Sequence, residues 1–547
     1  MASSKEPKVH LKITPEFNSL SEVYRLSIVL AIESAPLEEG STVVAFPHVV
    51  KETCIRESEL LAFDDNGELP VVIKDSTKEA GLAWIAGRNT TGNINLQYFA
   101  TPSSAASAPG KPDLSLRCDQ GGVLGSGLSF IPIPPGASRY RNVVEWDLSN
   151  APSGTRAIWT FGEGPDVIER IGPASFLNDS VYMVGPVQSH PTKSTADSIS
   201  EYYGYYWFGN LPSNIEVIKD MHHAFFLKVA EVFFDDSPSI QNPHRSFVRK
   251  TPTSFGGTSF NHSHIFDYDN QINQATDYDL VRRLAHETVH HWLGGSVTDE
   301  RIDWFYEGVR NVLSVYLPFR SRFRSGDYFS STINVLCTKY YTNPLIHLPQ
   351  AELLKAATSD FYARELVSSR AWAFVVGVDL RARRMSKLIR PIEDLAIKPL
   401  VKKKANGEPH GLSEFVALLQ PLMGEEIDER YEHMLKGSTI LLPPEMFGAK
   451  THRLIPKDQE ILDFGFHMQS FDEGIVMDLK SGSRAQQAGL KDEDKILSSS
   501  HISLCVDNFE SEMEVVIERQ GLETRIKYWP RAFEKAGSWH MVKVEAA

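Results

Sequence analysis

The sequence predicts a multidomain α+β protein with a β-rich N-terminal domain, a mainly helical central domain and a small mixed C-terminal domain. Its 547 residues are enough for three or four domains. Strand-like patterns are concentrated in residues 1–168 and helical periodicity in residues 169–455, whereas residues 460–535 return to strands around one short helix. Apolar residues make up 42% and charged residues 23% of the chain, which is ordinary for a globular protein.

The N-terminal domain is expected to consist of strands, because its apolar residues alternate with polar ones or form short runs bounded by turn-forming residues. The expected strands are Val9–Ile13, Tyr24–Ile32, Asn93–Phe99 and Asn142–Leu148. Between them, Thr101–Pro112 is rich in serine, alanine and proline, which predicts a loop.

Helical periodicity in the central domain is clearest in Ile215–Phe234 and Ala351–Leu388. The domain is expected to end before a linker, which we place at Pro443-Pro444 and in the polar stretch Lys450–Gln459.

Charge and composition exclude several classes of partner. A net charge of −14 argues against nucleic acid and against anionic membranes. No apolar run approaches the ~18 residues of a membrane span, and the opening residues lack the apolar segment of a secretory signal. The cysteines are scattered without CxxC pairs, which argues against a disulfide framework. We therefore expect a cytoplasmic protein that binds neither nucleic acid nor membrane.

The most informative motif is HETVH at His286–His290. Residues four apart on a helix share one face, so the two imidazoles can reach a single ion. Glu287 lies about 100° round the helix from the first histidine, where a general base for a bound water belongs. The apolar spacing of Tyr278–Ala285 predicts this helix, with Asp277 or Asp279 capping its start.

A third ligand is needed, because an HExxH match arises by chance in roughly a few per cent of chains this rich in histidine. Glu307 follows the motif in an apolar-periodic stretch that begins near Trp304. Two helices joined by a short turn would bring Glu307 back beside the histidine pair. His286, His290 and Glu307 would then hold one Zn²⁺ per chain, with a coordination position left open.

The expected chemistry follows from this ligand set. Zinc lowers the pKa of a bound water towards neutrality, and Glu287 would take the proton as the water attacks a carbonyl group. Asn311, one turn after Glu307, is expected to orient a histidine ligand by accepting its second ring N–H. His291 points away from the ligand face and is expected to pack or to support the ligands. The substrate would be a peptide or a small amide or ester.

The same residues resemble the glycyl aminopeptidase family of gluzincin zinc metallopeptidases. The resemblance rests on HETVHHWLGG at 286–295 and WFYEG at 304–308, and more loosely on GGVLG at 121–125 and VEWDLS at 144–149. It covers nearly the whole chain. It implies a thermolysin-like, mainly helical catalytic domain at 169–455, a PDZ-like domain at 460–535, and zinc-dependent aminopeptidase activity with some preference for small N-terminal residues.

One departure from the family concerns the substrate's amino group. The family carries a Gly-Gly-Leu-Glu stretch whose glutamate is thought to hold the α-ammonium. Here Gly256 and Gly257 match the glycines, so the resemblance implies that they bind substrate, but Ser259 stands in place of the carboxylate. A hydroxyl binds an ammonium group far more weakly than a carboxylate does. Exopeptidase specificity is therefore an open question.

A second departure concerns the tyrosine that the family and its relatives use to stabilise the tetrahedral oxyanion. Ser368 and Ser369 occupy the region where this tyrosine is expected, and Tyr362 is the nearest candidate. Losing one oxyanion donor typically lowers the rate by roughly 10²–10³. His262 and His264 are further candidate donors.

The PDZ resemblance rests on the last part of the chain. Leu462–Phe466 corresponds to the glycine-containing carboxylate-binding loop that leads into an exposed strand, while Ser483–Lys491 and Asp494–Leu497 match a short helix and the strand after it. Domains of this kind capture peptide ends by adding a strand to a sheet edge, so a peptide C-terminus or loop is a candidate partner. Asp463 would repel a peptide carboxylate, which favours a structural appendage instead.

Two other functions stay open beside the zinc hydrolase. The first is a catalytically weakened peptidase fold that serves as a peptide-binding scaffold through its PDZ-like domain. The second is a zinc enzyme that acts on a non-peptide metabolite by opening an epoxide or cleaving an ester. The hydrolase is favoured because Glu287 and all three candidate ligands are present together.

Overall fold

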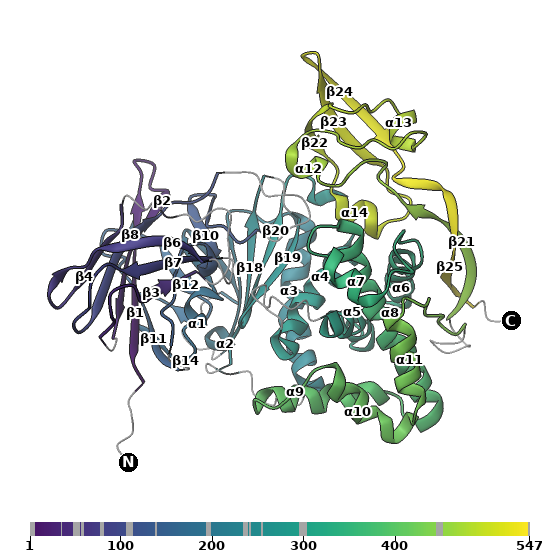
Figure 1. Cartoon of the computed structure of the whole chain (residues 1–547), viewed down its shortest axis with the longest axis horizontal. Helices are drawn as coiled ribbons and strands as arrows, with labels where there is room; N and C mark the ends of the chain where they lie inside the picture. Colours follow the sequence, from purple (N-terminus) through teal and green to yellow (C-terminus); the bar gives the residue numbers. More distant parts are fainter. Residues whose placement is uncertain are drawn as a thin grey trace.

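The computed structural model describes residues 6–33, 36–46, 55, 59–76, 81–104, 113–136, 139–192, 199–233, 239, 242–252, 255–294, 304–444 and 452–544. Along the chain, an N-terminal β region is followed by a mixed sheet, a helical region and a C-terminal β-rich region (Figure 1). This is the predicted α+β class, whereas the predicted domain boundaries stay predictions. Among the described helices, none has the length and apolarity needed to cross a membrane.

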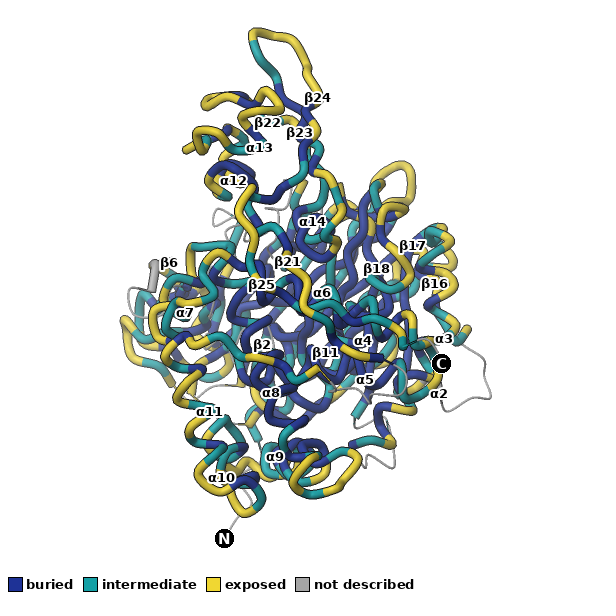
Figure 2. The backbone as a smooth tube through the Cα atoms, turned by 90° about the vertical axis from the view of Figure 1, so that its right-hand side faces the viewer, coloured by how far each residue is buried: buried dark blue, intermediate teal, exposed yellow. Residues whose placement is uncertain are grey.

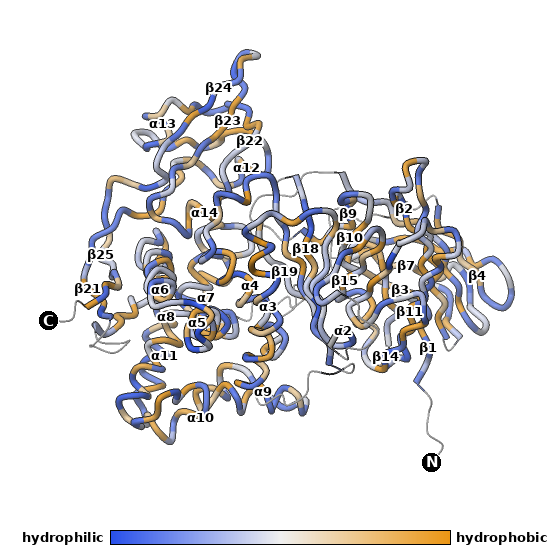
Figure 3. The backbone as a smooth tube through the Cα atoms, turned by 180° about the vertical axis from the view of Figure 1, so that it is seen from behind, coloured by the Kyte–Doolittle hydropathy of each residue, from blue (hydrophilic) through white to orange (hydrophobic). Residues whose placement is uncertain are grey.

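The N-terminal region contains three sheets around one core that includes Trp84, Trp159 and Tyr182. Its strands β1 (Lys8–Phe17) and β2 (Val23–Ile32) bury every second residue over most of their length. In β1 the buried apolar residues alternate with polar ones, whereas β2 ends in a run of apolar residues. Figure 3 colours the backbone of this region by hydropathy. All four strands predicted here are confirmed. The seven-stranded sheet has the order β14 (Ile168–Gly172), β11 (Tyr140–Trp146), β1 (Lys8–Phe17), β2 (Val23–Ile32), β8 (Ile94–Ala100), β4 (Leu61–Asp64) and β5 (Gly67–Glu68).

The two smaller sheets complete this region. The five-stranded sheet has the order β13 (Gly162–Glu163), β12 (Arg156–Trp159), β15 (Val181–Gly185), β10 (Gly122–Ser126) and β9 (Arg117–Asp119). The three-stranded sheet has the order β3 (Thr42–Ala45), β7 (Gly81–Ala86) and β6 (Val71–Ser76). The expected loop Thr101–Pro112 has no helix or strand over 101–104, and its residues 105–112 lie outside the described part of the chain.

A second five-stranded sheet stands where helical periodicity was expected to dominate. Its order is β16 (Val187–His190), β17 (Tyr203–Phe208), β18 (His244–Lys250), β20 (Ser263–Tyr268) and β19 (Gly256–Phe260). The mainly helical interpretation is therefore wrong for these five strands, whereas the helix predicted at Ile215–Phe234 is confirmed as α3 (Ser213–Val232). Strands β17 and β20 are buried along their whole length, so they lack the alternation that announces a strand. β19 forms the edge of this sheet and lies against the HExxH helix α4 (Asp277–Leu293).

The N-terminal cap of helix α4 is Thr276. The sequence suggested Asp277 or Asp279 for this role. The Thr276 hydroxyl accepts the Asp279 backbone N–H at 3.2 Å, while the Asp279 carboxylate accepts the Thr276 N–H at 3.0 Å. This reciprocal capping box satisfies two backbone donors at the helix start. Gly294 closes the helix with a φ of 69°, in the region that favours glycine.

The helical region packs around two central helices, α5 (Trp304–Arg320) and α8 (Phe361–Ser386). They approach so closely at Gly308 that a Cβ atom there would lie 2.5 Å from the Ala371 carbonyl carbon. Figure 2 shows α8 buried over most of its length. The other helices are α3 (Ser213–Val232), α6 (Gly326–Tyr341), α7 (Gln350–Ala356), α9 (Lys398–Ala405), α10 (Leu412–Met423) and α11 (Glu426–Leu435).

A long two-stranded ribbon, β21 (His452–Leu462) and β25 (Arg531–Lys543), joins the C-terminal region to the helices. The linker predicted at Lys450–Gln459 is therefore wrong from residue 452 onward. Beyond the ribbon lie α12 (Ser470–Glu473), α13 (Arg484–Gln487), β22 (Lys495–Ser499), α14 (Ile502–Asp507), β23 (Met513–Arg519) and β24 (Leu522–Tyr528). The predicted short helix and the strand after it correspond to α13 and β22.

The loop around Asp463 differs from the expectation in one respect. It leads into turns and α12, so the exposed strand predicted after it is not present among residues 466–479. The Asp463 carboxylate accepts the Gly465 N–H at 3.0 Å and pairs with Lys480 at 2.6 Å. The Gly465 N–H, a backbone donor of the loop expected to bind a peptide carboxylate, is thus already hydrogen-bonded to Asp463.

A buried ionic cluster fastens the C-terminal region to the helices. Asp507, at the end of α14, is 3% exposed and contacts Arg282 at 2.5 Å, Arg283 at 2.7 Å and Lys339 at 3.1 Å. Although burial alone would raise it, these three cations hold the pKa of Asp507 well below its ordinary value. The two arginines lie on α4, one turn before His286, so this cluster connects the C-terminal region directly to the HExxH helix.

We predict that Asp507→Asn destabilises the protein by about 3–5 kcal/mol, because three buried cations lose their shared counter-ion. The loss should appear as a lower midpoint in thermal and urea unfolding, and as faster proteolytic cleavage in the C-terminal region. Asp166→Asn, which changes an exposed aspartate, serves as the matched control. Equal midpoints for both variants would show that the cluster does not fasten the region.

Candidate active site

The structure brings the three candidate metal ligands together. Ligand atoms of His286, His290 and Glu307 all lie within 4.8 Å of one another. The two imidazole rings are 5.1 Å apart between centroids, and His286 Nε2 lies 3.3 Å from Glu307 Oε1. Two imidazole nitrogens and one carboxylate oxygen at this spacing fit a tetrahedral Zn²⁺ with a fourth position left for another ligand. Within the described part of the chain, this is the only such group.

Arg310 holds Glu307 in place. Its Nη1 donates to Glu307 Oε2 at 2.8 Å, and its Nη2 donates to the carbonyl of Gly294 at the end of α4. Burial opposes ionisation of Glu307, but His286 and Arg310 hold its pKa well below the ordinary value. Glu307 is thus kept as the anion that a metal ion requires.

Glu287 lies beside the ligand face of α4, about 100° round the helix from His286, and packs against the edge strand β19. It is 8% exposed, and its Oε2 accepts a hydrogen bond from the Ser259 hydroxyl at 2.5 Å. Gly257 makes this approach possible, because a Cβ atom there would lie 2.4 Å from Glu287 Cγ. Burial raises the pKa of Glu287, while His286 and the Ser259 hydroxyl counteract part of that rise. A carboxylate with a raised pKa is better suited to accept a proton near neutral pH.

The residues proposed to bind substrate divide into two kinds. Gly256 and Gly257 line the cleft described below, as expected of substrate-binding residues. Ser259 is buried, contacts Glu287 and is not among the described residues that line the cleft. Since residues two apart in a strand point to the same side, Gly257 and Ser259 both face α4. The structure therefore associates Ser259 with the carboxylate of Glu287.

Asn311 lies one turn after Glu307, lines the cleft and is 6% exposed. Its amide nitrogen donates to the Ser368 hydroxyl of α8 at 3.4 Å, a long hydrogen bond. Acceptance of a histidine N–H by its amide oxygen stays a prediction.

Tyr362 does not lie where an oxyanion-stabilising residue is needed, so this expectation is wrong. Its hydroxyl accepts the backbone N–H of Phe464 at 3.1 Å, and its ring packs against the core of the C-terminal region. Neighbouring α8 residues Phe361, Arg364 and Glu365 line the cleft instead. Tyr362 was chosen by its distance along the sequence, which says nothing about which face of α8 turns towards the C-terminal region. No tyrosine is among the described cleft residues.

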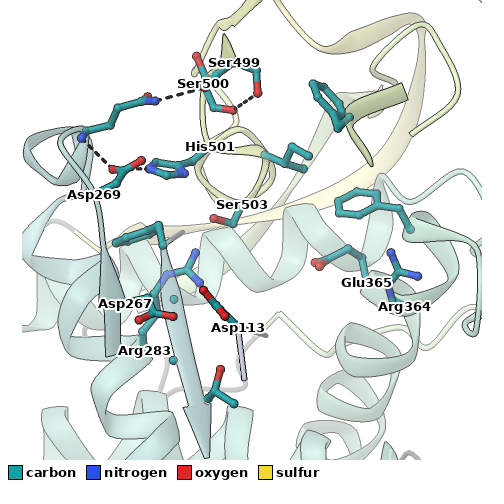
Figure 4. Close-up of a pocket in the computed structure, with 18 of the residues that line it drawn as sticks. Asp113, Asp267, Asp269, Arg283, Arg364, Glu365, Ser499, Ser500, His501 and Ser503 are labelled. Atoms are coloured by element: carbon teal, nitrogen blue, oxygen red, sulfur yellow. Dashed lines mark hydrogen bonds and ion pairs between the residues drawn. The ribbon is translucent and has the colours of Figure 1, made fainter. Parts of the chain in front are cut away.

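The cleft has a volume of about 620 Å³ and contains His286, Glu287 and Glu307. One wall comes from β19 and α4 and another from α8, as Figure 4 shows for several of the lining residues. The C-terminal region supplies a further wall through Ile496–Ser503. Here His501 contacts the Asp269 carboxylate at 2.9 Å, and Gln271 donates to the Ser499 carbonyl at 3.3 Å. No sequence pattern indicated that these segments meet.

Five histidines form a cluster behind α4, on the side of the helix away from the ligand pair. Neighbouring rings lie 5.2–5.9 Å apart between centroids. The members are His222, His244, His262, His264 and His291. His262 and His264 belong to this cluster and do not line the cleft, so the structure does not support them as oxyanion donors. The sequence showed no sign of this cluster, because its five histidines are far apart along the chain. They lie on α3, β18, β20 and α4 and in the turn before β20.

Hydrogen bonds hold one member of this cluster in its neutral form. The Thr288 hydroxyl donates to the Leu284 carbonyl at 2.6 Å, so it accepts from His222 Nε2 at 2.8 Å. His222 Nδ1 then accepts the Tyr203 hydroxyl at 2.8 Å. Burial lowers the pKa of His222 to about 3 and that of His262 to about 4.

The overall path of the chain is similar to that of a solved aminopeptidase N family protein. The crystal structure of an aminopeptidase N family protein from Idiomarina loihiensis matches with a TM-score of 0.67 over 98% of each chain, at 13% identity. This decides the fold. The chain has an aminopeptidase N-type fold. The predicted resemblance to the gluzincin aminopeptidases is thereby confirmed for the fold, whereas the glycyl aminopeptidase subfamily and the PDZ-like domain stay predictions.

Two other crystal structures match over a smaller part of this chain. An M1 zinc metallopeptidase from Deinococcus radiodurans matches 81% of this chain and 95% of its own, with a TM-score of 0.47 and 14% identity. Leukotriene A4 hydrolase from Saccharomyces cerevisiae matches 80% of this chain and 68% of its own, with a TM-score of 0.47 and 12% identity. No protein-family profile and no curated protein matches the sequence.

We predict that the protein loses stability as the pH falls from about 6.5 towards 4, because the buried histidines are neutral in the fold and take up protons on unfolding. A depressed folded-state pKa gives this sign: the contribution is complete above the unfolded pKa of about 6.5 and decreases below it. Each histidine contributes about 1.4 kcal/mol per pH unit.

Thermal unfolding between pH 4.5 and 7.5 measures this dependence. In His222→Gln the dependence should be shallower, whereas His433→Gln, at an exposed position on α11, should follow the wild-type curve. A melting temperature that does not change between pH 7 and 5 would contradict neutral burial of the cluster.

Proposed function

We propose that this protein is a zinc-dependent hydrolase, a metallo-aminopeptidase-like enzyme that acts on a peptide or on a small amide or ester. The observation that carries the proposal is the convergence of His286, His290 and Glu307. Two of these ligands, His286 and Glu307, line the same cleft as the carboxylate of Glu287. The aminopeptidase N-type fold supports it. Aminopeptidase specificity is the more detailed part of this proposal.

The donor set suits zinc, since imidazole nitrogen and carboxylate oxygen in a three-ligand arrangement are typical of catalytic zinc sites. His286, His290 and Glu307 would hold one ion per chain. When bound there, zinc would supply Lewis acidity that activates water and polarises a carbonyl group.

The chain's own residues would divide the remaining work. Glu287 would accept the proton of the attacking water and pass it to the leaving amine, because its pKa is raised by burial and its carboxylate faces the ligand site. Ser259 would keep that carboxylate in one orientation. Gly256 and Gly257 would offer backbone groups to an extended substrate, because β19 is the free edge of its sheet.

The peptide-binding scaffold receives less support. A strand-adding site needs an exposed strand after the loop at Asp463, and residues 466–479 contain turns and α12 in its place. The convergence of three ligands and a base has no role in a scaffold.

We predict that Glu287→Gln retains stoichiometric metal and loses hydrolysis by at least about 10²–10⁴-fold, as is typical when a general base is removed. His290→Ala should lose the metal. Metal content by elemental analysis, and turnover of a panel of aminoacyl arylamides, peptides and esters, measure the two effects. His433→Gln is the matched control. Bound zinc with no turnover of any amide, peptide or ester would favour the scaffold.

We also predict that Ser259→Ala lowers kcat by roughly 10- to 100-fold with little change in KM, since a hydrogen bond to a charged group contributes about 1.5–3 kcal/mol. Ser259→Thr keeps a hydroxyl at the same position and should retain most of the rate. If the alanine variant instead raised KM alone, Ser259 would be a substrate-binding residue as first expected.

A further inference from the structure

Almost every charged group that lines the cleft is already paired within the chain. Each lining carboxylate among the described residues has a hydrogen-bond or ionic partner. The pairs are Asp113 with Arg117, Asp267 with Arg249, Asp269 with His501, Glu287 with Ser259, Glu307 with Arg310, and Glu365 with Lys339 at 2.8 Å. Four of these carboxylates are paired with an arginine or a lysine, whereas the partner of Glu287 is a hydroxyl and that of Asp269 is a histidine.

The cations of the cleft are distributed differently. Arg282, Arg283 and Lys339 share Asp507 and Glu365, so this cluster holds three positive charges against two negative ones. Arg364 is the remaining cation, and among the described residues it has no acidic partner within bonding distance. Its one contact is a hydrogen bond of 3.5 Å to the Ala357 carbonyl, at the limit of a hydrogen bond. Among the described arginines and lysines that line the cleft, Arg364 is therefore the one without a carboxylate partner.

Arg364 stands at a defined distance from the ligand site. On α8 it lies one turn before Ser368, which contacts Asn311 of α5, and Asn311 lies one turn after Glu307. The two helices are antiparallel, because Gly308 packs against Ala371 while Asn311 contacts Ser368. The two turns therefore add to about 12 Å along the helices. An extended peptide covers this span with about three to four residues.

The surroundings of Arg364 strengthen a charge interaction there. Figure 4 shows Arg364 and Glu365 projecting from α8 beneath the C-terminal wall of the pocket. Phe361, one turn earlier, packs on the core of the C-terminal region and lines the same cleft as Phe471. Arg364 is half-buried in this cleft, and an ion pair that is partly shielded from water is stronger than one at an open surface. Guanidinium also binds a carboxylate through two parallel hydrogen bonds.

We propose that Arg364 binds a carboxylate of the substrate, three to four residues from the bond that is cleaved, and makes this protein selective for short anionic peptides. This inference rests on the proposed hydrolase function and adds its substrate class. The carboxylate is either the C-terminus of a short peptide or an acidic side chain at that position.

Matched peptides test this directly. Alanine tripeptides and tetrapeptides are prepared with a free C-terminus, with a C-terminal amide, and with an amidated C-terminal aspartate. Binding to zinc-loaded Glu287→Gln protein is measured by calorimetry, and hydrolysis by the wild type is measured separately. Peptides with a carboxylate should bind roughly 10- to 100-fold more tightly than the amides, as a charged hydrogen bond of about 1.5–3 kcal/mol predicts. The aspartyl amide distinguishes a side-chain carboxylate from a terminal one.

Variants at residue 364 complete the test. In the Glu287→Gln background, Arg364→Gln should abolish the preference for carboxylate and leave binding of the amides unchanged, and Arg364→Lys should keep part of the preference. Arg453→Gln changes an exposed arginine of β21 and should have no effect. Equal binding of carboxylate and amide peptides by protein that retains Arg364, or an equal loss of binding of both in Arg364→Gln, would overturn the proposal.

The two proposals fail in different ways. Hydrolysis without any preference for a carboxylate would retain the hydrolase and reject the role of Arg364. Carboxylate-selective binding that depends on Arg364, without turnover of any peptide, amide or ester, would retain the anion site and reject the hydrolase.

Discussion

One side chain, Arg310, joins the two helices on which the candidate metal site depends. It pairs with Glu307 at 2.8 Å and donates to the carbonyl of Gly294, the residue that closes α4. The Gly294 N–H in turn donates to the carbonyl of His290 at 2.7 Å. These contacts fix the position of His290 relative to the Glu307 carboxylate on α5. Arg310 is 3% exposed, so an unpaired guanidinium there would be unfavourable, and the pairing is correspondingly well defined.

Two glycines let the backbone come close enough for this geometry. Gly257 leaves room for the side chain of Glu287 against β19, and Gly308 lets α5 approach α8. A methyl group at either position would meet neighbouring atoms at 2.4–2.5 Å, so the helix or the strand would have to move. At Gly308 that movement would displace Glu307, which is the preceding residue. The geometry of the site thus depends on the lack of a side chain at Gly257 and Gly308 as well as on the side chains that carry its chemistry.

Local patterns predicted the parts of the site that local geometry determines. The i, i+4 spacing of His286 and His290 and the periodicity after Trp304 were sufficient to predict α4 and α5, and the structure places Glu307 beside the histidines. Strand β17 was missed because a strand buried on both faces has no alternation. Tyr362 was misplaced because the docking of the C-terminal region, and not the sequence around it, determines what its hydroxyl contacts.

The docking of the C-terminal region also explains why the cleft and the ligand helix behave as one unit. Asp507 binds two arginines that precede His286 by one turn on α4, while residues just before it in the chain form a wall of the cleft. The same contact gives Asp507 as a shared partner to three of the described arginines and lysines of the cleft, whereas Arg364 has no carboxylate partner among the described residues. If the protein is the proposed hydrolase, a C-terminal region held in this way would act on substrate choice by contributing a wall and charges to the cleft. It would therefore need no ligand of its own to influence what enters the site.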